Sequence, residues 1–220
     1  VDPANGVNEG NIVGDSLNPF LTINFAMSMI YPTEENPVTI HLTSGQYFQS
    51  NNGETFPIIM FSYLNLIGDG PESTILDGVS SVGVIVFDEV QGASIHWLTI
   101  TGGYAMYGGG ILIMDSDPVI KDVVIRNNIA SHEGGGISMW GSNAVFKNVH
   151  ISDNESEHIG GGISMWSSSP ILNYVSITDN IASSDGGGMI IAEVSNPIMN
   201  NVTISNNTAV DWGSGGGILI

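Results

Sequence analysis

The seven-residue stretch GGGISMW occurs at Gly134–Trp140 and again at Gly160–Trp166. Related stretches are GGGILIM at Gly108–Met114, GGGMIIA at Gly186–Ala192 and GGGILI at Gly215–Ile220. The first glycines of these five stretches are separated by 26, 26, 26 and 29 residues. A repeat of this length predicts a solenoid, in which each copy of the repeat stacks on its neighbours.

Apolar side chains recur at every second position after the glycines of each copy, which is the period of a β-strand. Two more short apolar segments follow in each copy, for example Pro118–Ile120 and Val123–Ile125. Three short strands joined by turns, with no helical period, make a coil of about 26 residues. Because stacked coils pair each strand with its own copy, the sequence predicts an all-β parallel β-helix. The crossover rule for parallel strands predicts that this β-helix is right-handed.

The glycines themselves begin each strand and are expected to allow a positive φ or close packing where the chain turns a corner. The first 57 residues do not follow this repeat and are predicted to form an N-terminal cap. Turn residues followed by apolar residues at helical spacing predict a capping helix over about residues 18–30. Val38–Leu42 is expected to be the first strand. Residues 58–220 would then form the coils, truncated within a repeat at Ile220, as in a piece of a longer protein.

The composition restricts the partners of the protein. Lys and Arg number 3 against 22 Asp and Glu, which gives a net charge of −19. Such a chain should repel nucleic acid, because it has almost no cations to neutralise phosphates. No apolar run is long enough for a transmembrane helix, so membrane insertion is not expected. Cysteine is absent, which excludes disulfides and thiolate metal sites.

Four segments carry a resemblance to a known family: Pro19–Ile23 (PFLTI), Gly45–Tyr47 (GQY), Gly53–Pro57 (GETFP) and Leu66–Gly68 (LIG). In this order they resemble the opening of right-handed parallel β-helix repeat proteins of bacterial surfaces, a secreted domain-of-unknown-function family. The GGGI coils are similar to the Gly-Gly-Ala-Ile repeats of polymorphic autotransporter passengers. The resemblance implies secretion, an extracellular or cell-surface location, and further anchoring or sorting domains in the same chain.

Trp140 and Trp166 are the first candidate site residues. They occupy the same position in successive copies, and strand alternation points both indoles outward. They are expected to form a flat aromatic strip, with Ser138 and Ser164 beside them on the same face. Exposed aromatic side chains of this kind bind sugars or anchor protein interfaces. A covering loop or a neighbouring domain would be the structural alternative.

A second candidate is the acidic edge before the glycines, with His132, Glu133, Glu157, His158 and Asp185. His132 and His158 are one 26-residue step apart, and a cluster of His and carboxylate groups is able to bind a divalent metal such as Ca²⁺. The repeated motifs of known Ca²⁺ loops are missing from the sequence. A solvated acidic turn is therefore the alternative reading of this edge, and no other cofactor is expected.

The most regular polar column is Asn128, Asn154, Asn180 and Asn207. Asn tolerates left-handed backbone geometry in turns, and stacked copies are able to bond amide to amide along the axis. We therefore expect this column to be a structural turn ladder rather than a binding site.

Catalysis needs groups that the repeats supply poorly. A polysaccharide lyase needs a base and cations that neutralise a uronate carboxylate, and the chain has three cations in all. A glycosidase needs paired carboxylates at a defined separation. Asp115/Asp117 and Asp153/Glu155 are such pairs by spacing, but this pattern is more typical of strand ends and turns. No catalytic residue is therefore assigned.

The sequence favours a non-catalytic extracellular or cell-surface module that acts as a rigid spacer, an adhesin or a glycan-binding platform. A polysaccharide or a cell-surface protein is the expected partner. One alternative is a polysaccharide lyase or glycoside hydrolase. Another is a subunit that associates end to end into fibres.

Overall fold

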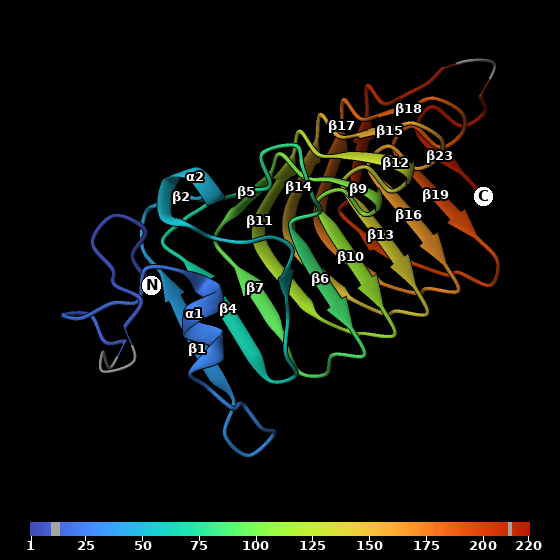
Figure 1. Cartoon of the computed structure of the whole chain (residues 1–220). Helices are drawn as coiled ribbons and strands as arrows, with labels where there is room; N and C mark the ends of the chain where they lie inside the picture. The colour runs from blue at the N-terminus through green and yellow to red at the C-terminus, as the bar shows by residue number, and fades with distance from the viewer. Residues whose placement is uncertain (10–13, 211–212) are drawn as a thin grey trace.

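The computed structural model describes residues 1–9, 14–210 and 213–220. Its strands form three parallel sheets that run along the molecule, with the N-terminal cap at one end and the last coil at the other (Figure 1). Each coil contributes a strand to the seven-stranded sheet B and a bent strand or strand pair to the eleven-stranded sheet A. The later coils add a strand to the five-stranded sheet C. The predicted parallel β-helix is confirmed.

The bounds of the strands follow the repeat. Sheet B contains β3 (Ile58–Ile59), β6 (Ile85–Asp88), β10 (Ile111–Met114), β13 (Ile137–Trp140), β16 (Ile163–Trp166), β19 (Met189–Ala192) and β23 (Ile218–Leu219). Sheet C contains β9 (Tyr104–Tyr107), β12 (Ile129–Glu133), β15 (Glu155–Ser156), β18 (Ile181–Ala182) and β22 (Thr208–Ala209). The main path of sheet A contains β1 (Val38–Leu42), β4 (Leu64–Gly68), β7 (Ser94–His96), β11 (Val119–Arg126), β14 (Val145–Ser152), β17 (Ile171–Thr178) and β20 (Ile198–Asn200). Its side branches are β2 (Gly45–Tyr47), β5 (Thr74–Asp77), β8 (Thr99–Thr101) and β21 (Thr203–Ser205).

Residues that are 26 positions apart in the sequence are direct partners in the sheets. Ile111 pairs with Ile137, Ile137 pairs with Ile163, and Ile163 pairs with Met189. All four side chains are fully buried and belong to one continuous core. Since the paired residues are identical or similar in volume, each coil packs against its neighbours in nearly the same way.

The two segments Pro118–Ile120 and Val123–Ile125, which were predicted as separate strands, belong to one strand in the structure. Val119–Arg126 forms the eight-residue β11, which bends at Asp122, whose φ is +54°. Trp97, Asn148 and Tyr174 occupy the equivalent position in neighbouring coils, also with positive φ.

The third sheet, sheet C, comes from residues such as Ile129–Glu133, which the sequence pattern assigns to a turn. Short strands of mixed polarity such as β12 do not show a clear period of two.

The predicted capping helix is much shorter than residues 18–30. Helix α1 spans Ile23–Ser28, because the hydroxyl of Thr22 accepts a hydrogen bond from Phe25 N and caps the helix there. Asn8 holds the preceding backbone in a non-helical conformation by accepting hydrogen bonds from Leu21 N and Thr22 N. A second short helix, α2, spans Gln49–Asn52. Strand β1 has the predicted bounds and already belongs to sheet A, so the stacking begins before residue 58.

Helix α1 is anchored by a buried carboxylate. Glu54 accepts hydrogen bonds from Ile23 N at 2.5 Å and from Asn24 N at 3.1 Å, so it binds the unpaired amides of the first helical turn.

In the described part of the chain, no helix is long and apolar enough to cross a membrane.

Candidate functional site

The two tryptophans lie on the outer face of sheet B. Trp140 ends β13 and Trp166 ends β16, and the two residues are direct partners in the sheet. Their rings are stacked, with centroids 5.5 Å apart and planes inclined by 16°. Two indoles at this separation are too close to lie side by side in one plane, so their faces overlap. The outward direction agrees with the sequence, but the strip presents ring edges rather than a flat platform.

Ser138 and Ser164 share the outer face with the tryptophans, yet both are fully buried. Trp140 Nε1 donates a hydrogen bond to Ser138 Oγ at 3.1 Å, and Ser164 Oγ donates to the same oxygen at 3.1 Å. The serines therefore hold the Trp140 ring in place, and their hydroxyls are covered rather than presented to solvent.

The two histidines form a second pair of contacting rings, next to sheet C. His132 lies in β12, and its ring centroid is 4.9 Å from that of His158 in the next coil, with the planes inclined by 52°. Tyr107, at the end of β9, contacts both pairs edge-on, with centroids 5.5 Å from His132 and 5.9 Å from Trp140. We call Tyr107, His132, Trp140, His158 and Trp166 the aromatic cluster. It lies across the corner that the glycines form between sheets C and B.

Glu133 is enclosed beside this aromatic cluster, with its side chain 6% exposed. Its Oε1 atom is 3.2 Å from His132 Nδ1, in a geometry that does not make a hydrogen bond. Its Oε2 atom has no hydrogen-bond partner among the described residues, and the same is true of His132 Nδ1 and Trp166 Nε1. Buried polar atoms without a partner are rare in folded proteins, so the three of them in and next to the aromatic cluster mark it as a candidate site.

The predicted metal edge is not assembled as a cation site. His132 contacts Glu133 and His158, but Glu157 and His158 are exposed, and Asp185 accepts hydrogen bonds from Ser184 Oγ and Ser214 N. Within residues 1–9, 14–210 and 213–220, no group of three or more His, Cys, Asp or Glu side chains is placed to hold a metal ion.

The Asn column lies inside the turn between sheets A and C. Asn128 Nδ2 donates to Asn154 Oδ1 at 3.0 Å, and Asn154 Nδ2 donates to Asn180 Oδ1 at 3.0 Å. Asn180 Nδ2 continues the chain to Asn207 Oδ1 at 2.9 Å. The first three residues are buried, and the left-handed backbone belongs to the residue before each of them, such as Asp153. The column is an internal hydrogen-bonded ladder that links the coils.

A third outward tryptophan lies between β7 and β8 of sheet A. Trp97 is 47% exposed, and its Nε1 donates to Asp122 Oδ2 at 3.0 Å. Lys121 Nζ is 3.6 Å from the same oxygen, and Asn148 Nδ2 donates to Asp122 Oδ1 at 2.7 Å. Burial alone would raise the pKa of Asp122, but the Asn148 hydrogen bond, the Lys121 charge and the Trp97 hydrogen bond lower it. These polar groups partner one another, unlike those at the aromatic cluster.

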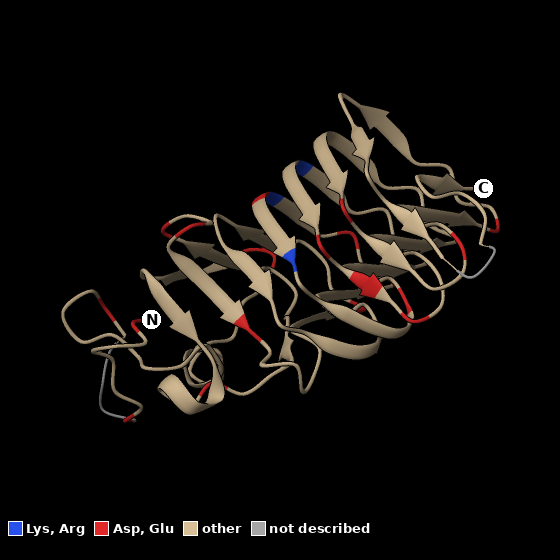
Figure 2. Cartoon of the chain, turned by 90° about the horizontal axis from the view of Figure 1, so that it is seen from above, with Lys and Arg blue, Asp and Glu red and all other residues tan. Residues whose placement is uncertain are grey.

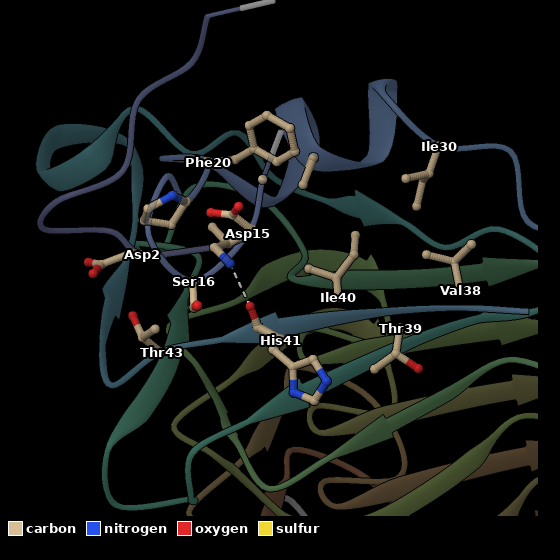
Figure 3. Close-up of a pocket in the computed structure, with 14 residues that line it drawn as sticks. Asp2, Asp15, Ser16, Phe20, Ile30, Val38, Thr39, Ile40, His41 and Thr43 are labelled. Atoms are coloured by element: carbon tan, nitrogen blue, oxygen red, sulfur yellow. Dashed lines mark hydrogen bonds between the residues drawn. The ribbon is translucent and has the colours of Figure 1, made fainter. Parts of the chain in front are cut away.

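A pocket of about 470 Å³ lies at the N-terminal cap, between α1 and β1 (Figure 3). Phe20, Ile30 and Ile40 give it apolar walls, and Asp2 and Asp15 also line it. Residues 10–13, which precede its lining residue Gly14 in the sequence, are outside the described part of the chain, so we assign it no function. Neither this pocket nor the role of Tyr107 was predicted from the sequence. Tyr107 is one 26-residue step before Glu133, so the repeat alone could have placed it next to the acidic edge.

Solved structures of pectin methylesterase are similar to this chain at low sequence identity. One, a mutant in complex with hexasaccharide IV, has 13% identity and a TM-score of 0.44, over 84% of this chain and 69% of that chain. Pectin methylesterase in complex with hexasaccharide VII has 13% identity and a TM-score of 0.45 over the same shares. Pectin methylesterase PemA from Erwinia chrysanthemi has 10% identity and a TM-score of 0.41, over 87% of this chain and 69% of that chain. At these values the likeness concerns the fold alone.

No curated protein matches the chain in sequence. The family model for the right-handed β-helix region matches residues 83–220, which cover β6 and all later coils and make up more than half of the chain. The protein is therefore a member of the right-handed β-helix family.

Proposed function

We propose that this protein is a non-catalytic glycan-binding module of an extracellular or cell-surface protein. The observation that carries the proposal is the aromatic cluster, in which the stacked pair Trp140 and Trp166 lies on the outer face of sheet B. Trp166 of this cluster and Glu133, which contacts His132 of the cluster, each carry a buried polar atom without a partner among the described residues. Aromatic rings next to hydrogen-bonding groups are the usual composition of a sugar-binding surface.

The β-helix would contribute rigidity to this site. The backbone of β13 is hydrogen-bonded to β10 on one side and to β16 on the other, so its side chains have fixed positions along the axis. A site that is already ordered loses little conformational entropy when a ligand binds, and this preserves affinity. The same stiffness suits a spacer or an adhesin that presents the cluster at a distance from a surface.

The proposed location and partners follow from this role. A polysaccharide outside the cell or a glycan-bearing cell-surface protein would be the partner, as the resemblance to secreted bacterial surface proteins also implies. Further domains of the same chain would anchor the module. The net charge of −19 opposes binding to nucleic acid.

The test compares binding to a glycan array for the parent protein and for the double variant Trp140→Ala/Trp166→Ala. Binding should weaken at least tenfold, since buried aromatic contacts dominate the affinity of such interfaces. Trp97→Ala is the matched control, because it removes an exposed tryptophan from sheet A, away from the cluster. Circular dichroism would verify that all variants fold. Equal binding by the parent and the double variant would contradict the proposal.

A catalytic role is the second candidate, and the contact between His132 and Glu133 favours it. A carboxylate beside an imidazole is a common way to orient a general base. Incubation with a panel of polysaccharides distinguishes the two functions. Newly formed reducing ends or unsaturated sugars that disappear in His132→Ala would identify a hydrolase or a lyase and overturn the non-catalytic proposal. Filaments detected by concentration-dependent light scattering would favour end-to-end assembly instead.

A further inference from the structure

The unpartnered atoms at the aromatic cluster define what a ligand must offer. Glu133 Oε2 is a carboxylate oxygen and accepts hydrogen bonds, whereas Trp166 Nε1 donates only. Both atoms are enclosed and lack partners among the described residues. A ligand that satisfies both must carry a donor and an acceptor. A hydroxyl group is both, and neighbouring hydroxyls on a sugar ring supply several such groups.

The charge around the cluster argues against an anionic ligand. Glu133 is nearly buried, where charges interact more strongly than in water, and Glu155 and Glu157 lie in the next coil. The three cations of the chain are Lys121, Arg126 and Lys147, which belong to β11 and β14 of sheet A. In Figure 2 these blue segments lie on strands in the middle of the molecule, while red segments are spread along its length. A uronate, sulfate or phosphate group at Glu133 would meet a carboxylate without a compensating cation.

The ring geometry argues against a cationic ligand. An aromatic cage binds an ammonium group through ring faces that surround it. Trp140 and Trp166 turn their faces toward each other, and Tyr107 meets Trp140 edge-on at 77°. These rings do not converge on a common point with open faces. Edges of stacked indoles instead offer apolar surface.

Access to Glu133 depends on His132. The imidazole is 41% exposed and lies 3.2 Å from a carboxylate that is only 6% exposed. His132 Nδ1 has no hydrogen-bond partner among the described residues, so the ring is held by its contacts with Tyr107 and His158 rather than by a hydrogen bond at this atom. Rotation of this side chain is the simplest movement that would let a ligand group reach Glu133 Oε2.

We infer that the aromatic cluster selects uncharged glycans, with a sugar hydroxyl that donates to Glu133 Oε2 and a second ligand oxygen that accepts from Trp166 Nε1. This inference rests on the proposed glycan-binding function and names the ligand class of the same site. Glu133 is the residue that sets the selectivity, and His132 is the side chain that turns to admit the ligand.

The first experiment uses a glycan array that contains neutral, uronate-bearing, sulfated and amine-bearing oligosaccharides. The parent protein should retain neutral glycans at least tenfold better than uronates of the same backbone. Affinity for the neutral ligands should not change between 0.05 and 0.5 M NaCl, because no charge pair forms. Preferred binding of uronate, sulfated or amine-bearing glycans would overturn the inference but leave glycan binding intact. Absence of any glycan binding would overturn both proposals.

The second experiment compares Glu133→Gln with Glu157→Gln, which makes the same change of charge on an exposed residue one coil away. Glu133→Gln should weaken neutral-glycan binding at least threefold and reduce the discrimination against uronates, while Glu157→Gln should change neither. Equal effects of the two variants would overturn the role of Glu133.

Two more variants keep the inference testable if Glu133→Gln does not fold. Trp166→Phe retains the aromatic ring but removes the N–H donor, so neutral-glycan affinity should fall at least threefold. His132→Ala should increase the association rate of neutral glycans, because it removes the side chain that covers Glu133. Unchanged binding in Trp166→Phe, or an unchanged association rate in a folded His132→Ala, would contradict the proposed contacts.

Discussion

At the scale of single residues, the outer face of sheet A shows how a position in the repeat selects its amino acid. Asp122 has φ of +54°, and Asn148 and Asn201 have nearly the same φ in the same column. Asn and Asp tolerate the left-handed region better than other side chains apart from glycine. Trp97 and Tyr174 also occupy the column, so bulky side chains are accepted where they lie outside on the surface.

Asp122→Asn tests the electrostatic part of this arrangement, because Asn fits the same backbone conformation. The folded pKa of Asp122 lies below its ordinary value of 3.8, so the ionised group stabilises the fold above that pH. The contribution is lost as the pH falls through the lower folded pKa. Urea unfolding should show the variant to be less stable at pH 7, by less than about 1 kcal/mol, since exposed charges are screened. The difference should shrink between pH 4 and pH 2.

The control for this prediction is Asp153→Asn, the same exchange at a left-handed position in the neighbouring turn, where Asn127 and Asn206 are the equivalents. Its unfolding free energy should follow the pH profile of the parent. A difference between Asp122→Asn and the parent that does not vary with pH would show that the charge of Asp122 is irrelevant.

At the scale of elements, the corner between sheets C and B depends on glycine for two physical reasons. Gly134 has φ of +66°, and a Cβ atom there would lie 2.2 Å from the carbonyl oxygen of Ile137. Gly135 has no such φ, but a Cβ atom would lie 2.3 Å from Glu155 O of the next coil. The repeated triplet therefore combines a left-handed turn with close contact between coils.

Gly134→Ala should lower the unfolding free energy by at least about 3 kcal/mol, because strain and steric overlap add at this position. Gly53→Ala is the matched control, since Gly53 has φ of +78° but no atom within 4 Å of the position that a Cβ atom would take. It should lose only about 1 kcal/mol, the cost of the left-handed conformation for alanine. Urea unfolding of both variants measures the difference. Similar losses would show that crowding at the corner is unimportant.

At the scale of the whole molecule, the net charge of −19 opposes the compact state through mutual repulsion of carboxylates. Added NaCl shortens the screening length from about 10 Å at 0.1 M to about 3 Å at 1 M. We expect this change to raise the unfolding free energy by about 1 kcal/mol and the Tm by about 2–4 °C. Thermal unfolding followed by circular dichroism measures the effect.

The salt effect should be smaller near pH 4, where about half of the carboxyl groups are protonated. An equal or larger gain at that pH would indicate that salt acts through the hydrophobic effect rather than through charge screening.

The repeat in the sequence was enough to predict the solenoid, the strand positions whose side chains are buried in the core, and the residues that are neighbours in successive coils. Trp140 lies next to Trp166, and Asn128 lies next to Asn154, because in-register parallel stacking brings residues one repeat apart together. Capping signals were less informative for α1, since Thr22 and Asn8 shorten the helix through contacts that no local pattern reveals.

The tertiary structure alone decided which columns meet across the corner. The sequence by itself placed Tyr107 one coil before Glu133 and Trp140 one coil before Trp166, but not that these two columns come into contact between two sheets. That contact depends on the angle at which the glycines turn the backbone. It also depends on how the indoles pack, and this packing buries Ser138 and leaves the carboxylate of Glu133 enclosed without a full set of partners. Stacking is periodic and can be read along one dimension, whereas the environment of a side chain at a corner is set by three-dimensional packing.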